Sequence, residues 1–241
     1  INHDGFVSYL PTLMDFPLQI SFTEALLDDF NWGKGFIKPY KVLASDFLYP
    51  NPNNLLIFPD NHDMARFYTQ VKNDIDLFKM GIVYYSTMRG IPQFYYGTEI
   101  LMNSDENPGD HGLIRTDFPG GWLGDKINAF NGDGLSIKQL ETQKFFKQIL
   151  NWRKNNNIIH NGKLIQFAPK DGIYSFFRIL ENKMVWVIFN RNNSSKTLAT
   201  SRFDELIENH KSAFDVLNKK KISISEKLII NAKSALILEI E

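Results

Sequence analysis

A short polar run directly follows an apolar segment in the first third of the chain. Residues 55–58 are Leu-Leu-Ile-Phe, and residues 60–63 are Asp-Asn-His-Asp. The apolar run is typical of a strand buried on both faces, and ligands gather at the carboxyl ends of such strands in parallel α/β folds. Carboxylates beside a histidine and an amide can hold sugar hydroxyls and stabilise positive charge on a reacting ring. The same residue types are also common in turns, where Asp63 would simply cap the next helix.

The segments around this run alternate between helix and strand patterns. The spacing of apolar residues predicts helices over 21–30, 73–88 and 137–153, and Ser21 is a suitable N-cap for the first of them. Residues 91–96 form a second short apolar run, which predicts another strand. Strands and helices in this order predict βαβ units and a parallel sheet.

The sequence changes character after Gly162. Short runs rich in β-branched and aromatic residues are separated by turns, which predicts an antiparallel β-sandwich with a short helix over 202–208. Residues 1–158 hold 14 basic and 18 acidic residues, whereas residues 159–241 hold 13 and 9. We therefore expect two domains, an α/β domain over 1–158 and an all-β domain over 159–241, with a turn-rich boundary between them.

The composition excludes several classes of function. Basic and acidic residues number 27 each, so the basic excess of a typical nucleic-acid-binding protein is absent. The sequence has no cysteine, which rules out disulfides, thiolate zinc sites and iron–sulfur clusters. No apolar run approaches the ~20 residues that a membrane span needs. We expect no nucleic-acid partner and no membrane span, and the composition leaves the cellular compartment open.

One acidic loop is a candidate for calcium binding. Residues 103–110 concentrate oxygen-bearing side chains of the kind that bind calcium, but they lack the order of an EF-hand loop. A solvated acidic loop is therefore the alternative to a metal site. The five histidines are not paired at a zinc-binding spacing. We predict no cofactor, with calcium at this loop as the open alternative.

Two longer motifs occur in an informative order. Residues 58–63 are Phe-Pro-Asp-Asn-His-Asp, and residues 90–99 are Gly-Ile-Pro-Gln-Phe-Tyr-Tyr-Gly-Thr-Glu. They resemble the fourth conserved region and the eighth barrel strand of the α-amylase family, glycoside hydrolase family 13. Residues 14–18 and 117–122 resemble segments of its neopullulanase and cyclomaltodextrinase members. The resemblance covers essentially the whole chain.

The resemblance implies a role for each matching residue. Asp63 would be the carboxylate that stabilises the transition state, His62 would hydrogen-bond the sugar beside the cleaved bond, and Asn61 would brace the loop. Arg115 matches an arginine of the substrate-contacting loop after the eighth strand. Trp122 would either stack on a sugar ring or pin its glycine-rich loop. The implied reaction is retaining hydrolysis of α-1,4-glucosidic bonds in α-glucan oligosaccharides, without a redox cofactor.

The resemblance also implies that part of the catalytic machinery is missing. Residues 1–158 would be the C-terminal portion of a (β/α)8 TIM barrel, followed by an antiparallel β-sandwich. In the family, the nucleophilic aspartate and the acid/base glutamate follow the fourth and fifth strands, and no segment here resembles either motif. We expect the chain alone to be inactive and its incomplete barrel to self-associate through exposed edges and apolar faces. The alternative is a non-catalytic carbohydrate-binding or interaction fragment in which Trp122 and Trp32 bind glucan.

Overall fold

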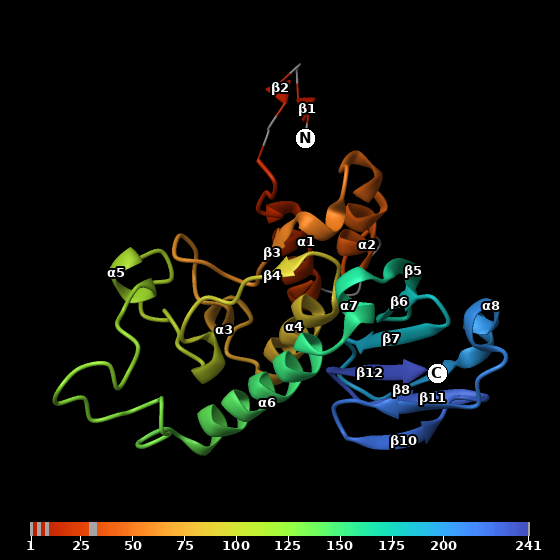
Figure 1. The fold of residues 1–241 in the computed structure, drawn as a ribbon. Helices are drawn as coiled ribbons and strands as arrows, with labels where there is room; N and C mark the ends of the chain where they lie inside the picture. The colour runs from red at the N-terminus through yellow and green to blue at the C-terminus, as the bar shows by residue number, and fades with distance from the viewer. Residues whose placement is uncertain (1, 4–5, 8–9, 29–32, 241) are drawn as a thin grey trace.

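The computed structural model describes residues 2–3, 6–7, 10–28 and 33–240. Most helices lie in the first part of the chain and most strands in the second, and the two parts pack side by side (Figure 1). The first part contains β1 (Asn2–His3), β2 (Phe6–Val7), α1 (Phe16–Leu27), α2 (Ile37–Ala44), β3 (Leu56–Ile57), α3 (Phe67–Gln70), α4 (Ile75–Thr87), β4 (Ile91–Pro92), α5 (His111–Ile114), α6 (Ile137–Lys154) and α7 (Asn157–Asn161). Three short 3-10 helices lie among them, η1 (Asp46–Leu48), η2 (Pro52–Asn54) and η3 (Thr98–Ile100).

Helix α1 begins at Phe16, five residues before the expected start at Ser21. The Asp15 carboxylate accepts a hydrogen bond from Leu18 N (3.1 Å), and Pro17 stands in the first turn, where its missing N–H costs nothing. Ser21 lies inside the helix, where its hydroxyl donates to Leu18 O (3.0 Å). The cap is therefore an aspartate that the expected helix did not include.

The other two expected helices are confirmed with small changes at their ends. Asp74 caps α4 by accepting hydrogen bonds from the backbone of Asp76 and Leu77. Ser136 and Gln139 form a reciprocal capping box at the start of α6. Both helices therefore start at a side chain that satisfies their first N–H groups.

Three short parallel strand segments lie side by side in chain order. Met14 bridges Leu56, and β3 pairs with β4 so that Leu56 lies opposite Ile91. The expected strand over 91–96 is shorter, because the chain turns away after Pro92. The long connection from η3 to α6 carries α5 and extends away from the rest of the molecule (Figure 1).

The second part is antiparallel. It contains β5 (Lys163–Lys170), β6 (Ile173–Leu180), β7 (Lys183–Asn190), β8 (Lys196–Ala199), β9 (Ser212–Asp215), β10 (Lys220–Ser223), β11 (Lys227–Ile230) and β12 (Ser234–Ile240). A six-stranded sheet has the order β10-β9-β12-β7-β6-β5, and β11 pairs with β8 in a separate two-stranded sheet. The expected helix over 202–208 is present as η4 (Thr200–Phe203) followed by α8 (Asp204–Ile207).

The two faces of the six-stranded sheet contribute to different cores. Alternate residues along β6 and β7, such as Phe176 and Phe189, pack with Phe22 and Tyr84 from α1 and α4. The intervening residues, such as Trp186, pack with β8, β11 and η4. The first core crosses residue 158, so the division into domains at that point stays a prediction.

Several apolar side chains remain exposed around the short parallel strands. The exposed set comprises Leu10, Met14, Phe16, Ile20 and Ile91. Such a group is larger than the scattered exposed apolar residues of an ordinary surface. Within the described part of the chain, no helix has both the length and the apolar character needed to cross a membrane.

Candidate active site

The residues that follow the parallel strands divide into buried anchors and exposed groups. Asp15 follows the first strand segment and is buried, with its carboxylate 2.7 Å from Arg89 Nη1. Arg89 also binds Asp46, at 2.6 Å between Nη2 and Oδ1. The two carboxylates hold the pKa of the Arg89 guanidinium above its usual range, against the opposing effect of burial. Asp15 therefore stabilises the fold and is not available to substrate.

The loop after β3 is folded by its own side chains. Asn61 is buried, and its side-chain oxygen accepts a hydrogen bond from Asp63 N (2.8 Å). This contact across two residues is the Asx-turn that asparagine favours. It turns the chain sharply, so that Asp63 and His62 point outward while Asn61 points inward.

Asp63 lies at the centre of an exposed charged cluster. Its Oδ1 is 2.8 Å from Arg115 Nη2, and its Oδ2 is 3.2 Å from His62 Nε2. Arg115 Nε also donates to the His62 carbonyl (2.9 Å), and its Nη2 lies 2.6 Å from His111 Nδ1. The side chain of Asp63 remains 60% exposed. The cluster therefore presents a carboxylate of fixed orientation that a ligand can reach.

His111 belongs to this cluster although the sequence analysis gave it no role. Its Nδ1 lies 3.9 Å from Asp63 Oδ1. Asp110 caps α5 by accepting from Gly112 N (2.7 Å), and His111 and Arg115 are four residues apart on that turn. Residues at this spacing share one helix face, which is the sequence signal that could have found His111.

Asp60 is a buried carboxyl directly before the exposed residues. Its Oδ2 accepts from Phe67 N (2.7 Å), and the Thr98 hydroxyl lies 3.4 Å from both of its oxygens. Burial raises the pKa of Asp60 to about 7, although the Phe67 hydrogen bond and the Arg66 charge oppose the shift. Asp60 thus ties the start of the loop to α3 and η3.

Arg66 anchors the other end of the loop. Its guanidinium is buried, donates to the Tyr96 carbonyl and lies 4.2 Å from the Tyr95 ring centroid and 4.8 Å from that of Tyr96. Cation–π contacts of this kind are stronger away from water. Asp60 and Arg66 together hold residues 61–65 between two fixed points. The sequence analysis named Asp60 only as part of the polar run at 60–63 and gave Arg66 no role.

Trp122 is placed apart from the cluster. Its ring is 68% exposed, and no contact recorded among the described residues joins it to Asp63 or Arg115. Its backbone is fixed instead, because the Asp125 carboxylate accepts from Trp122 N (3.1 Å) and Gly120 N (2.7 Å). The indole is therefore free to contact a ligand but does not pin the loop. Trp32 lies outside the described residues.

The calcium candidate is a loop held by protein contacts. The Asp105 carboxylate accepts from the Thr69 hydroxyl (2.6 Å) and from Asn73 Nδ2 (2.7 Å). Over the part of the chain that the structure describes, no three His, Asp or Glu side chains gather closely enough to bind a metal ion. The alternative of a calcium site at this loop gains no support from these contacts.

Comparison with known proteins gives matches across both parts of the chain. A family model for the cyclo-malto-dextrinase C-terminal domain matches residues 164–239. A cyclomaltodextrin glucanotransferase of Thermoanaerobacterium thermosulfurigenes is 26% identical over 195 residues, which are 81% of this chain and 24% of that protein. Another, from Paenibacillus macerans, is 33% identical over 157 residues, which are 65% of this chain and 19% of that protein.

A solved structure has the same fold. The α-amylase of Geobacillus thermoleovorans, crystallised with acarbose, aligns with a TM-score of 0.76 and 20% identity. The alignment covers 95% of this chain and 48% of that chain. At this identity the similarity shows the fold alone.

The fold and the exposed carboxylate define a class of protein. Its first part is α/β, with polar groups at the ends of parallel strands, and its second part is all-β. The sequence matches are more specific, because the relatives include cyclomaltodextrin glucanotransferases and an α-amylase, and they support the resemblance to the α-amylase family, glycoside hydrolase family 13, that the two motifs indicate. The chain spans about a fifth to a quarter of the two glucanotransferases and about half of the solved amylase chain.

Proposed function

We propose that this chain is part of an α-glucan-processing enzyme with a retaining mechanism, in which Asp63 stabilises the transition state. The observation that carries the proposal is the exposed Asp63 carboxylate, which Arg115 and His62 hold in one orientation. A fixed negative charge of this kind favours the oxocarbenium-like sugar of glycoside hydrolysis. The cyclomaltodextrin glucanotransferases and amylases among the relatives support α-1,4-glucosidic bonds as the target.

We assign roles to the remaining site residues on the same basis. His62 would hydrogen-bond the sugar beside the cleaved bond, and Arg115 would fix both His62 and Asp63 through its two contacts. Asn61 would brace the loop from its buried side, in agreement with its low exposure and the hydrogen bond that it accepts from Asp63 N. Trp122 would stack on a more distant sugar ring.

We infer that residues 1–158 form the C-terminal portion of a (β/α)8 barrel and residues 159–241 a β-sandwich domain. The parallel order of the segments at Met14, β3 and β4, with helices between them, supports the barrel. The packing of the six-stranded sheet with β8 and β11 supports the sandwich. Residues 1–241 alone would not turn over substrate, because they offer no match to the family's nucleophile and acid/base motifs.

Maltoheptaose is the probe that tests this assignment on the chain itself. Titration followed by backbone NMR should shift the resonances of residues 61–63 and 111–115, and a hydrolysis assay should show no turnover. Asp63→Asn should weaken the binding, whereas Glu181→Gln, at an exposed turn of the all-β part, should not. Turnover by the chain alone would refute the inferred inactivity.

A longer chain that carries the remaining barrel units allows the catalytic role to be measured. There, Asp63→Asn should lower kcat by at least about a hundredfold, because one fixed electrostatic contact to a transition state is worth that much. The thermal midpoint should stay unchanged, since the Asp63 side chain is exposed. Near-normal kcat in this variant would refute the role of Asp63.

A non-catalytic glucan-binding fragment is the second candidate, and the exposure of Trp122 is the observation that favours it. Exposed indole rings stack well on the apolar faces of sugars. If this reading holds, Trp122→Ala should abolish maltoheptaose binding while Asp63→Asn leaves it unchanged. The reverse pattern supports the active-site assignment.

We also infer that the chain self-associates through the exposed apolar side chains around Met14 and Ile91. Light scattering should then give a mass above 27.9 kDa that falls on dilution. A monomer at all concentrations would contradict this inference.

A further inference from the structure

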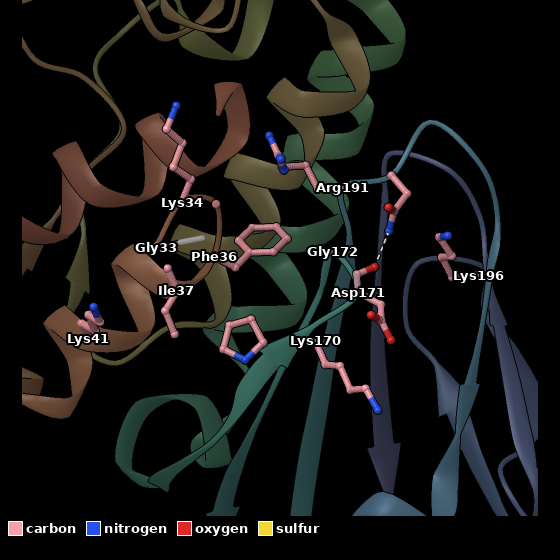
Figure 2. Close-up of a pocket in the computed structure, with 13 residues that line it drawn as sticks. Gly33, Lys34, Phe36, Ile37, Lys41, Lys170, Asp171, Gly172, Arg191 and Lys196 are labelled. Atoms are coloured by element: carbon pink, nitrogen blue, oxygen red, sulfur yellow. Dashed lines mark hydrogen bonds between the residues drawn. The ribbon is translucent and has the colours of Figure 1, made fainter. Parts of the chain in front are cut away.

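A cavity unrelated to the Asp63 cluster lies between the first part of the chain and the six-stranded sheet. Its volume is about 780 Å³, within the range of small-molecule sites. One wall is the segment 33–37 and the start of α2, and the other is the turn between β5 and β6 together with the chain after β7. Figure 2 shows Phe36 and Ile37 on the first wall facing Gly172 and Arg191 on the second.

The residues that line this cavity are strongly cationic. Among the described residues that line it, five side chains are basic and one, Asp171, is acidic, although the whole chain has no net charge. The basic residues come from three separate segments, and they are Lys34, Lys41, Lys170, Arg191 and Lys196. Basic side chains gathered from distant segments around one concave surface raise the local concentration of anions.

The start of helix α2 adds to this positive potential. Phe36 precedes the helix and has no side-chain group that could accept from the first N–H groups. The first N–H groups of the helix therefore have no side-chain acceptor at the cap position, and the Asp28 carboxylate accepts instead from Gly35 N, one residue before the cap. Gly33 and Gly35 have φ values of 75° and 67°, which turn the chain sharply before the helix. The helix alone would not define a site, but here it adds to a charged cavity.

Both walls are held rigidly. Gly35 N donates to Asp28 Oδ2 (2.9 Å), and Lys38 Nζ lies 2.8 Å from the same carboxylate, so this acid is already paired. Arg191 is buried, donates to the Asp28 carbonyl and reaches across to the position beside Gly35. The first wall is therefore fixed to the second by Arg191.

The second wall depends on two buried or half-buried asparagines. Asn190 is fully buried, and its Nδ2 donates to the carbonyls of Ser194, Ile230 and Asn231. Asn192 Nδ2 donates to the Asp171 carbonyl (2.8 Å), the bond drawn in Figure 2. The backbone of this wall is therefore preformed, and the affinity lost to reorganisation would come mainly from ordering the lysine side chains.

We propose that this cavity binds a phosphate monoester on a sugar-sized body. The half-buried side chains of Ile37 and Pro169 would contact the body, and the Phe36 ring, which is buried in the core, supports this wall from behind. The surrounding lysines have flexible stems and would turn their ammonium groups toward the phosphate. This site is independent of the proposed glucan chemistry, because none of its residues belongs to the Asp63 cluster.

Glucose 6-phosphate is a suitable probe, with glucose as its uncharged match and inorganic phosphate as the anion without a body. In backbone NMR titrations, glucose 6-phosphate should shift the resonances of Gly35, Gly172 and Asn192. Inorganic phosphate should bind at least tenfold more weakly, and glucose should leave these resonances unmoved. Added salt should weaken the binding, because the lysines are solvent-exposed or half-buried.

A matched pair of triple variants separates the site from general charge. Replacement of Lys34, Lys170 and Lys196 by alanine should weaken binding of glucose 6-phosphate at least tenfold. Replacement of Lys220, Lys221 and Lys227, which do not line the cavity, removes the same charge and should change affinity less than twofold. The single change Lys170→Glu, at an exposed residue, should weaken binding of glucose 6-phosphate about threefold to tenfold. It replaces the triple variant as the test if that variant does not fold.

Three results would overturn the proposal. The first is an equal loss of affinity for glucose 6-phosphate in the two triple variants. The second is glucose that binds as tightly as glucose 6-phosphate. The third is a titration with glucose 6-phosphate in which the resonances of Gly35 and Gly172 do not move. Inorganic phosphate as tight as glucose 6-phosphate would overturn the part of the proposal that concerns the sugar body.

Discussion

The aromatic core between the two parts of the chain and the Asp63 cluster use side chains in opposite ways. In the core, Phe22 stacks on Tyr84 with ring centroids 3.6 Å apart, and both residues are fully buried. In the cluster, Asp63, His62 and Arg115 pair with one another while remaining roughly half exposed. The close-packed core stabilises the fold but has no group that could react with a ligand. The exposed cluster presents such groups but contributes little to the stability of the fold.

The loop that carries Asp63 joins these two regions. Asp60 binds Phe67 N, and the Phe67 ring lies in the core against Gly81, where even a methyl group would clash. Motion of the core would therefore reach the exposed carboxylate through Asp60 and Phe67. Substitutions on either side of this connection test how far the two regions are independent.

The largest expected effect comes from the core. Phe22→Ala should lower the free energy of unfolding by about 3–5 kcal/mol, the usual cost of emptying a buried phenylalanine site. Because Phe22 contacts both Tyr84 and Phe189, we expect hydrogen exchange in α4 and in β7 to accelerate together. Phe47→Ala, at an 82% exposed ring, is the control and should have almost no effect. Faster exchange in α4 alone would show that the two parts unfold separately.

The second prediction concerns the buried carboxyl between core and cluster. Burial raises the pKa of Asp60 to about 7 from 3.8, so the folded protein holds this proton more tightly than the unfolded chain. The carboxyl therefore contributes stability at low pH that is lost as the pH rises from about 4 to about 7. Relative to Asp60→Asn, the wild-type chain should lose about 4 kcal/mol of stability over that range.

Urea unfolding at pH 5 and pH 8 measures about 3 kcal/mol of this change, because the carboxyl of the unfolded chain is already ionised at pH 5. Asp60→Asn keeps an oxygen that can accept from Phe67 N, so the variant should fold. Asp171→Asn, at an exposed turn, is the control, and its stability relative to wild type should vary by less than about 1 kcal/mol. A difference between wild type and Asp60→Asn that does not depend on pH would show that Asp60 is ionised when folded.

The sequence predicted the order of helices and strands and the antiparallel second part, but only part of the site, and the barrel and the domain boundary stay predictions. Strong apolar periodicity predicted α4 and α6, and the motifs at 58–63 and 90–99 predicted the family. The start of α1 was missed, because the cap at Asp15 follows from pairing with Arg89 and from Pro17, and apolar spacing registers neither.

The site residues that the sequence analysis missed depend on contacts between distant segments. Arg66 binds Tyr96, which is 30 residues away, and His111 approaches Asp63 across 48 residues of chain. The Arg66 contact leaves no local pattern, and the local signal for His111 is its four-residue spacing from Arg115. Trp122 is the opposite case. The sequence singled it out as a candidate sugar-binding residue, but within the described part of the chain it has no contact with the Asp63 cluster.

The smallest expected effect on stability comes from the cluster itself. Arg115→Gln removes an ion pair with Asp63 whose partners are 45% and 60% exposed. Exposed pairs of this kind contribute about 0–1 kcal/mol, because water competes for both charges and two side chains must be ordered. We therefore expect the unfolding free energy to fall by less than about 1 kcal/mol, with the loss shrinking further as salt screens the pair. Arg115→Lys, which keeps the charge but not the two-pronged contact with the His62 carbonyl and Asp63, is the matched control. A loss above 2 kcal/mol in Arg115→Gln would mean that the cluster helps to hold the fold, and the contrast with the aromatic core would then fail.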